Sequence, residues 1–361
     1  MSTSARHLPN APLHPADDFP LHQTADTLVR VASDNPRWTE RWYFNLQQPD
    51  GSMLGICGGG FYPGAGVLEV YACLLHEGRQ FNLRQRVVEF DRSRTDAASA
   101  VTFDITDPMK SWTMRARGSM CVFDLSFSAS GLPYLFPPFV VAADLPHEAS
   151  PLQVDAVQHF VQPGTVRGEL RAGGRTLDVE ARSFRDRTWG IRTSRPRLHQ
   201  WYVLHLDDGS QLNLIHQERA DGAIMVSHIA RVTSGGTIET GVIDSHSLTF
   251  DPASRLLLHG RFQAHTAEGA RIEVAVDNAG EGVRLVGAGY TDAQGEPTDF
   301  GRVQEDAWDL ADPAIVARVG KGTIDSPVTA HCVWGQESLS GIGITETAIA
   351  RNHWRYGSRL S

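Results

Sequence analysis

The chain has 361 residues and a formal net charge of −9, and 41% of its residues are hydrophobic and 21% charged. This is the composition of a globular protein, and the length suits two domains better than one. The acidic balance and the lack of a Lys/Arg run argue against a nucleic-acid partner. The longest apolar stretch, residues 132–143, contains three prolines and is far shorter than the roughly 20 residues that cross a bilayer. We therefore expect no membrane span.

The N-terminus and the cysteines bear on localisation. The first 30 residues are polar and rich in proline, without a charged segment followed by an apolar one. A secretory signal would show that pattern, so we expect a cytoplasmic protein. The cysteines form no CxxC pair, and each lies in an apolar run, which predicts reduced, buried thiols at Cys57, Cys73, Cys121 and Cys332.

In chain order, residues 1–35 are expected to form an arm that lies on the body of the protein. Beyond them, period-2 alternation and β-branched or aromatic residues dominate, with turn signals at short intervals. Clear predicted strands cover residues 42–46, 53–56, 67–71 and 101–105. The best helical candidate is 309–318, where Asp312-Pro313 is placed like a helix start. The sequence thus predicts an almost all-β protein.

An internal repeat indicates how this β structure is divided. Residues 42–56 read WYFNLQQPDGSMLGI and residues 201–215 read WYVLHLDDGSQLNLI, so both give Trp-Tyr, a strand, an Asp-Gly-Ser turn and a second strand. A second echo follows in the same order, VTFD at 101–104 and LTFD at 248–251. Two echoes in order favour a duplication, although any β protein can repeat such hairpins. We expect one β-barrel or sandwich domain over 36–165 and a second over 166–361.

The segment between the two copies, Leu132 to Phe139, reads LPYLFPPF. Its three prolines exclude a helix or a central strand. We favour a packed linker, and the alternative is an apolar lid over a ligand pocket.

Common catalytic motifs are absent. The glycine-rich residues 55–66 do not fit GxGxxG and precede a strand pattern rather than a helix. The sequence has no Walker motif, GxSxG elbow or HExxH. Nucleotide hydrolysis, Rossmann redox chemistry and serine hydrolysis of the common type are therefore disfavoured.

The segment from Ser183 to Arg192, SFRDRTWGIR, is the first candidate for chemistry. On a strand, Asp186, Thr188 and Arg192 share one face, and Arg185, Arg187 and Trp189 share the other. A pocket that desolvates Asp186 would raise the pKa of its carboxyl and make it a proton donor. The alternative is a buried Arg–Asp network that fixes a bulge at Gly190.

The hairpin that ends at residue 218 is the second candidate. A two-residue Asp208-Gly209 loop would pair Asp207 with Ser210 and place five polar or aromatic side chains on one face. These are His199, Trp201, His205, His216 and Glu218. The face could be solvated or a core with satisfied histidines, and it could instead line a catalytic cavity. His199, His216 and Glu218 could also bind iron or zinc.

Two weaker signals lie near the C-terminus. Residues 329–335 could bring His331 into a pocket, and the final Gly341–Glu346 stretch reads as a strand whose Glu346 could pair with an arginine. A structural role is the favoured interpretation for both.

The sequence DRTWGIR at 186–192 resembles the AttH-like, lipocalin-type (calycin) family that includes carotenoid 1,2-hydratases. The Gly-x-Gly-x-x-Glu at 341–346 is also similar to this group. The resemblance covers the two-barrel layout, but only these short motifs are specific. It implies two tandem lipocalin-like barrels, hydratase, cyclase or pericyclic chemistry on terpenoid, polyene or polyketide substrates, and no organic cofactor. It makes Asp186 the candidate proton donor. The flanking arginines oppose that role, since a nearby cation lowers a carboxyl pKa.

Three functions follow as hypotheses. The first is a cofactor-independent lyase or isomerase that acts on an apolar unsaturated small molecule such as a terpenoid, steroid or aromatic metabolite. In it Asp186 moves the proton, and His216 and His205 act as base or position water. Its substrate-binding residues are Trp189, Arg192, Trp201, Tyr202, Glu218 and His331. The second is a carrier that binds a hydrophobic ligand without chemistry, and the third is a metal-dependent enzyme on the histidine face. A homodimer is left open.

Overall fold

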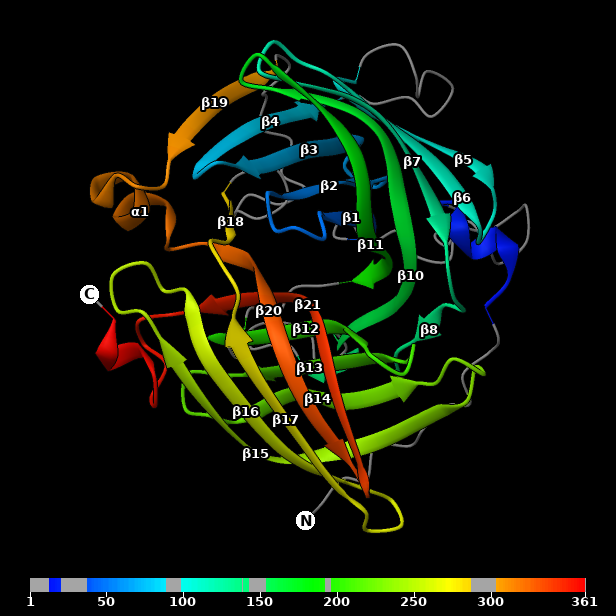
Figure 1. The fold of residues 1–361 in the computed structure, drawn as a ribbon, viewed down its shortest axis with the longest axis vertical. Coiled ribbons are helices and arrows are strands. Elements are labelled where there is room, and N and C mark those ends of the chain that lie inside the picture. The colour runs from blue at the N-terminus through cyan, green and yellow to red at the C-terminus, as the bar shows by residue number, and fades with distance from the viewer. Residues whose placement is uncertain are drawn as a thin grey trace.

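The computed structural model describes residues 13–20, 38–88, 99–137, 139–142, 154–191, 196–286 and 303–360. Over these ranges strands dominate and form two large antiparallel sheets (Figure 1). The helical segments described are η1 (Pro15–Asp18), α1 (Pro313–Val319) and η4 (Gly357–Arg359). None of the described helices is long and apolar enough to span a membrane. The predicted all-β architecture is confirmed.

The first sheet is built mainly from the N-terminal half of the chain. Its order is β19-β4-β3-β2-β1-β11-β10-β7-β6-β5, and β8 and β9 also pair with β10. Its strands are β1 (Trp38–Gln47), β2 (Met53–Tyr62), β3 (Val67–His76), β4 (Arg79–Val87), β5 (Val101–Asp107), β6 (Ser111–Arg117), β7 (Cys121–Ala129), β8 (Tyr134–Leu135), β9 (Phe139–Ala142), β10 (Val154–Ala172), β11 (Arg175–Ile191) and β19 (Gln304–Asp309).

The second sheet closes on itself. Its order is β17-β16-β15-β14-β13-β12-β21-β20-β18, and a further pairing of β17 with β20 closes eight of these strands into a barrel. Its strands are β12 (Leu198–Leu206), β13 (Gln211–Glu218), β14 (Ile224–Val232), β15 (Ile238–Phe250), β16 (Leu257–Thr266), β17 (Arg271–Asn278), β18 (Val283–Leu285), β20 (Thr323–Trp334) and β21 (Glu337–Ile349). The expectation of calycin-like domains in tandem agrees with this layout.

The two sheets share an order of connection. In each, the first strand (β1 or β12) pairs with the next strand and with a late strand (β11 or β21). The turns after β1 and β12 are also alike, because the Oδ1 atoms of Asp50 and Asp208 accept from the N–H groups of Ser52 and Ser210 at 2.9 Å and from their hydroxyls at 2.6 Å. The shared order and turn support the duplication inferred from sequence.

The chain passes from the first sheet to the second later than the predicted domain boundary. The expected division between residues 165 and 166 falls inside β10, and the second sheet begins at Leu198. The chain also crosses back, because β19 pairs with β4 of the first sheet. The limits of the domains as folding units stay a prediction.

Smaller expectations agree with the structure where it describes them. Helix α1 starts as predicted, with the Asp312 carboxylate accepting from the Ala314 N–H at 2.8 Å. All four cysteines are free and buried. In the proline-rich segment, Tyr134 and Phe136 are buried, as expected of a packed linker.

Apolar side chains form three buried clusters. One lies on the inner side of the first sheet and one inside the second barrel. The third takes residues from both sheets, including Tyr43 and Phe184 from the first and Trp201, Val203 and Ile344 from the second. This interface cluster packs the facing sides of the two sheets together.

A buried ion pair joins the N-terminal segment to the first sheet. The Arg185 Nη1 lies 2.6 Å from the Asp18 Oδ1, and both side chains are fully buried. The Trp112 indole N–H also donates to Asp18, at 3.3 Å. The Arg185 guanidinium lies 5.2–5.9 Å from the ring centroids of Trp112, Phe127 and Phe160. Arg185 of the 183–192 segment is therefore paired with an acid from outside it, Asp18, and the bulge expected at Gly190 is not found, because β11 pairs with β1 and β10 there without a register shift.

We expect Asp18→Asn to lower the free energy of unfolding by about 3 kcal/mol, because it leaves the Arg185 cation buried without a counter-charge. Urea denaturation measures the loss. The matched control is Glu77→Gln, which removes an exposed ion pair to Arg175 (2.5 Å) and should cost less than about 1 kcal/mol. Equal losses in the two variants would contradict the prediction.

Candidate functional site

A row of polar and aromatic side chains crosses the second sheet on the face turned to the first. Asp325 on β20 is the register partner of Glu346 on β21, and Glu346 is the partner of Trp201 on β12. Register partners project from the same face of a sheet. Trp201 belongs to the interface cluster, so all three side chains are directed at the first sheet.

A facing row crosses the first sheet. Asp186 on β11 pairs with Tyr43 on β1, Tyr43 pairs with Gly58 on β2, and Gly58 pairs with Tyr71 on β3. A Cβ at Gly58 would lie 2.6 Å from the Tyr71 hydroxyl oxygen and 2.5 Å from the Trp42 carbonyl oxygen. The glycine at this position therefore makes room for the Tyr71 ring.

One hydrogen bond joins the two rows. The Tyr43 hydroxyl donates to the Asp325 Oδ2 at 2.5 Å, between residues 282 positions apart in the chain. Both side chains are buried, and the second carboxyl oxygen, Oδ1, has no hydrogen-bond partner among the described residues. We call Tyr43, Asp186, Trp201, Asp325 and Glu346 the interface site.

The surroundings of the Asp325 carboxyl favour its protonated form. Burial raises its pKa well above the usual value, and the charges of Glu346 and Asp186 raise it further, against the hydrogen bond from Tyr43, which lowers it. With Tyr43 donating to Oδ2, the proton belongs on Oδ1. In its protonated form Asp325 would present an O–H close to two further acidic side chains, Asp186 and Glu346.

A histidine from the same sheet holds Glu346. The His199 Nε2 lies 2.8 Å from the Glu346 Oε1, and the His199 Nδ1 lies 2.8 Å from the Gln217 Nε2. The amide N–H of Gln217 is a donor only, so Nδ1 accepts and Nε2 carries the proton given to Glu346. The glutamate predicted to pair with an arginine thus pairs with His199.

Aromatic rings surround these groups. Trp201 lies 5.9 Å from Tyr43, 5.4 Å from Phe184 and 5.5 Å from His159, measured between ring centroids. His159 also lies 4.0 Å from the Asp186 carboxylate. The Trp201 indole N–H is buried and has no hydrogen-bond partner among the described residues. The site combines apolar walls with a few polar groups, as small-molecule sites do.

The two faces of β11 were predicted correctly over the described residues. Asp186 lies near His159, and the Thr188 hydroxyl is hydrogen-bonded to the His159 Nδ1 at 2.8 Å. Arg185 and Arg187 point the other way, where their partners are Asp18 and Glu40. The arginines are therefore paired with other acids on the opposite side of the sheet from Asp186.

The predicted single face of the 199–218 hairpin was wrong. Its loop has three residues, 207–209, because the Leu206 N–H donates to the Ser210 carbonyl at 2.9 Å. The pairs are therefore His205 with Gln211 and Trp201 with Ile215. A slip of one residue moves one strand's side chains to the other face. His199, Trp201 and His205 face the first sheet, whereas His216 and Glu218 lie inside the second barrel.

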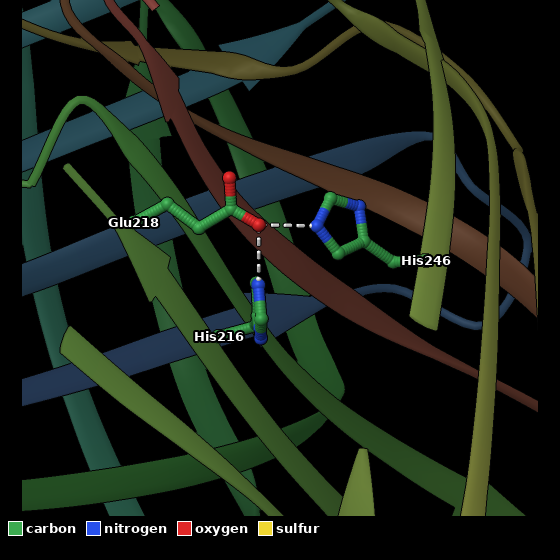
Figure 2. A group of neighbouring side chains, drawn as sticks. All are labelled: His216, Glu218 and His246. Atoms are coloured by element: carbon green, nitrogen blue, oxygen red, sulfur yellow. Dashed lines mark hydrogen bonds and ion pairs between the residues drawn. The ribbon is translucent and has the colours of Figure 1, made fainter. Parts of the chain in front are cut away.

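His216 and Glu218 belong to a separate cluster at the barrel interior (Figure 2). The Glu218 Oε1 lies 2.9 Å from the His216 Nε2 and 2.5 Å from the His246 Nε2, and its Oε2 lies 2.9 Å from the His353 Nε2. All four side chains are buried. We call His216, Glu218 and His246 the barrel triad.

Ionisation of Glu218 is favoured in this setting. Burial alone would raise the pKa of its carboxyl, but the hydrogen bonds from three histidines outweigh burial and lower it. Burial lowers the pKa of His216 despite its bond to Glu218. The metal set proposed from sequence, His199, His216 and Glu218, is divided between two faces, and His246 takes the place of His199.

The remaining predicted site residues are scattered. Tyr202 is buried inside the second barrel, and its hydroxyl donates to Gln200 at 2.6 Å. Trp189 packs against Phe160 on the arginine side of β11. His331 is exposed and bonds to Ser338. The prediction for Arg192 lies outside the described residues. His205 faces the first sheet, and burial and the charge of Arg182 lower the pKa of its ring to about 4.

The sequence analysis did not identify Asp325 and Tyr43 of the interface site, or His246 and His353, which contact Glu218 inside the barrel. No predicted element covered Asp325, although it is an ionisable residue beside the apolar Ile324 and two positions before Pro327. Tyr43 stood in the repeat but was interpreted as strand pattern only. His246 and His353 lie 28 and 135 residues from Glu218, so spacing alone could not join them.

The comparisons with known proteins identify the family and the fold. A family model described as a domain of unknown function, DUF7064, matches residues 24–289. This chain belongs to that family. No curated protein matches the sequence.

Two solved structures are similar over most of the chain. A putative AttH from Nitrosomonas europaea has a TM-score of 0.57 and 16% identity, covering 96% of this chain and 99% of that one. Kievitone hydratase from Nectria haematococca has a TM-score of 0.57 and 9% identity, covering 86% and 89%. The fold of the AttH-like group, expected from the motif at 186–192, is therefore found. At these identities the likeness concerns the fold alone.

The raised pKa of Asp325 gives a test by pH. Since the folded-state pKa lies above the unfolded value of about 3.9, the folded chain keeps a proton that the unfolded chain loses. Wild-type stability therefore falls as the pH rises from about 4 toward the folded-state pKa, by up to about 1.4 kcal/mol per pH unit. The Asp325→Asn variant has no carboxyl to titrate at this position. Its free energy of unfolding, measured by urea denaturation, should therefore rise relative to that of wild type between about pH 5 and about pH 7.5.

The exposed Asp178 serves as the control position for this experiment. The difference between Asp178→Asn and wild type should not change over the same pH interval. Parallel profiles for wild type and Asp325→Asn would show that the carboxyl ionises normally in the folded protein.

Proposed function

We propose that this protein is a cofactor-independent lyase or isomerase that hydrates, dehydrates, isomerises or cyclises an apolar unsaturated small molecule at the interface site. A terpenoid, steroid or aromatic metabolite fits this description. The observation that carries the proposal is the buried Asp325 carboxyl, which accepts a hydrogen bond from Tyr43 and whose pKa is raised by burial and by the charges of Glu346 and Asp186. A hydratase among the structures of the same fold is consistent with it.

Proton donation is the first step that these residues support. An acid whose pKa is raised toward the working pH is an effective donor. In a hydration, the Asp325 O–H would protonate one alkene carbon, so that a C–H bond forms as the π bond breaks. The developing cation would lie among Trp201, Tyr43 and Phe184, whose ring faces attract positive charge.

Proton acceptance is the second step. A water oxygen would add to the cationic carbon and pass its proton to the Asp186 carboxylate, which lies 4.0 Å from the His159 Nδ1. In an isomerisation the same base would remove a proton from carbon instead. In this proposal Asp325 becomes the donor and Asp186 the acceptor, and His216 has no part because it lies inside the barrel.

Product analysis in D₂O tests the proposal. The purified protein is incubated with a mixed pool of terpenoid, steroid and aromatic alkenes, and products are followed by mass spectrometry. We expect a product larger by one water, or an isomer, that carries deuterium on carbon. Asp325→Asn and Asp186→Asn should each lower its rate by roughly 10²–10⁴-fold, the usual contribution of a general acid or base.

His331→Gln is the matched control, because His331 is exposed and lies six residues further along β20 than Asp325, and its rate should equal that of wild type. A carrier gives a different result. A compound retained unchanged, with equal affinity, by wild type and both aspartate variants would overturn the catalytic proposal for that compound.

A further inference from the structure

The barrel triad is a set of metal-ligand atoms that the interface site does not use. One possible ligand atom from each of His216, Glu218 and His246 lies within 4.8 Å of the other two, and all three residues are buried (Figure 2). His216 and Glu218 come from β13 and His246 from β15, so the arrangement depends on the barrel fold. An ion with bonds of about 2 Å to each atom fits among them after small side-chain rotations.

We propose that His216, Glu218 and His246 bind one divalent transition-metal ion of the zinc class inside the second barrel. Two imidazole nitrogens and one carboxylate oxygen suit Zn²⁺, Fe²⁺ or Mn²⁺ and do not suit Ca²⁺ or Mg²⁺, which take oxygen ligands. The proposal is independent of the interface site, because these side chains project from the opposite face of β12 and β13.

The outer partners of the two histidines fit metal binding. The His216 Nδ1 lies 3.2 Å from the Ser227 hydroxyl, and the His246 Nδ1 lies 3.0 Å from the Tyr356 hydroxyl. A hydroxyl can donate or accept, so it accepts the Nδ1–H when Nε2 binds the ion. Metal-binding histidines are commonly oriented by a hydrogen bond of this kind.

His353 is arranged as a positioning residue rather than a ligand. Its Nδ1 accepts the Tyr356 backbone N–H at 3.3 Å, so the proton is on Nε2, which donates to the Glu218 Oε2. This bond holds the carboxylate while leaving Oε1 to the ion. His353 follows β21, so the ion would also attach the C-terminal segment to the barrel.

Charge gives an independent reason. Glu218 is buried, and within the described parts of the chain its ion-pair partners are all histidines. A histidine carries a charge only when it is protonated, and a buried carboxylate whose charge is not balanced is costly. A divalent ion at the barrel triad supplies the balancing cation.

Metal binding to the full chain tests the proposal. After chelator treatment and dialysis, the protein is titrated with Zn²⁺ and, in parallel, with Co²⁺. The bound metal is then measured by elemental mass spectrometry. We expect one tightly bound ion per chain, and visible absorption of the Co²⁺ form from nitrogen and oxygen ligands. A wild-type chain that retains no ion under these conditions overturns the proposal.

Variants separate the triad from adventitious binding. His246→Gln and Glu218→Gln should weaken binding by more than about 100-fold, and His353→Gln and Ser227→Ala by roughly 10-fold to 100-fold, the usual effect of an outer partner. His259→Gln, which removes an exposed His–Asp pair (2.6 Å to Asp277), should bind like wild type. Unchanged affinity in His246→Gln and Glu218→Gln would overturn the proposal.

Two further measurements distinguish loss of metal binding from misfolding and from loss of catalysis. Circular dichroism shows whether each variant folds. If the triad variants do not fold, the milder Ser227→Ala and His353→Gln variants test the proposal instead. Metal affinity equal to that of wild type in both of them would contradict the assigned contacts. Asp325→Asn should keep the ion, so loss of catalysis and loss of metal are measured as separate results.

Discussion

The hydrogen bond from Tyr43 to Asp325 links the two halves of this protein. It joins the first strand of the first sheet to β20 of the second, between side chains that are both buried. Around it, apolar residues from both sheets form one cluster, so the relative position of the sheets is fixed by packing and directed by this polar contact. The acidity of Asp325 depends on the same arrangement, because burial between the sheets and the charges of Glu346 and Asp186 raise its pKa.

Duplication explains why two different polar centres arise on equivalent hairpins. β1 and β12 start their sheets in the same way, yet each strand has an inner and an outer face. The face turned toward the other sheet carries Tyr43 and Trp201 of the interface site. The inner face of the second barrel carries His216 and Glu218, whose counterparts in the first repeat, with the Asp-Gly-Ser turns aligned, are Gly58 and Gly60. One ancestral hairpin can thus serve an interface and a barrel interior.

Much of the fold could be predicted from sequence, because strand periodicity and the repeated Asp-Gly-Ser turn are local signals. The opposite faces of Asp186 and Arg185 followed from period-2 alternation and agree with the structure. The hairpin register failed, because a loop of three residues and a loop of two both fit Asp208-Gly209, and the choice sets which face His216 takes. Asp325 could not be joined to Tyr43 from sequence, since their contact depends on how two sheets pack across 282 positions.

The strand β19 has a consequence for how the chain is made. It is formed by Gln304–Asp309, after most of the second barrel, yet it covers the edge of β4 in the first sheet. During synthesis from the N-terminus, the backbone N–H and C=O groups along that edge have no strand partner until the ribosome has added more than two hundred further residues beyond β4. An uncovered strand edge can pair with another chain. Completion of the first half of the molecule is therefore tied to synthesis of the second.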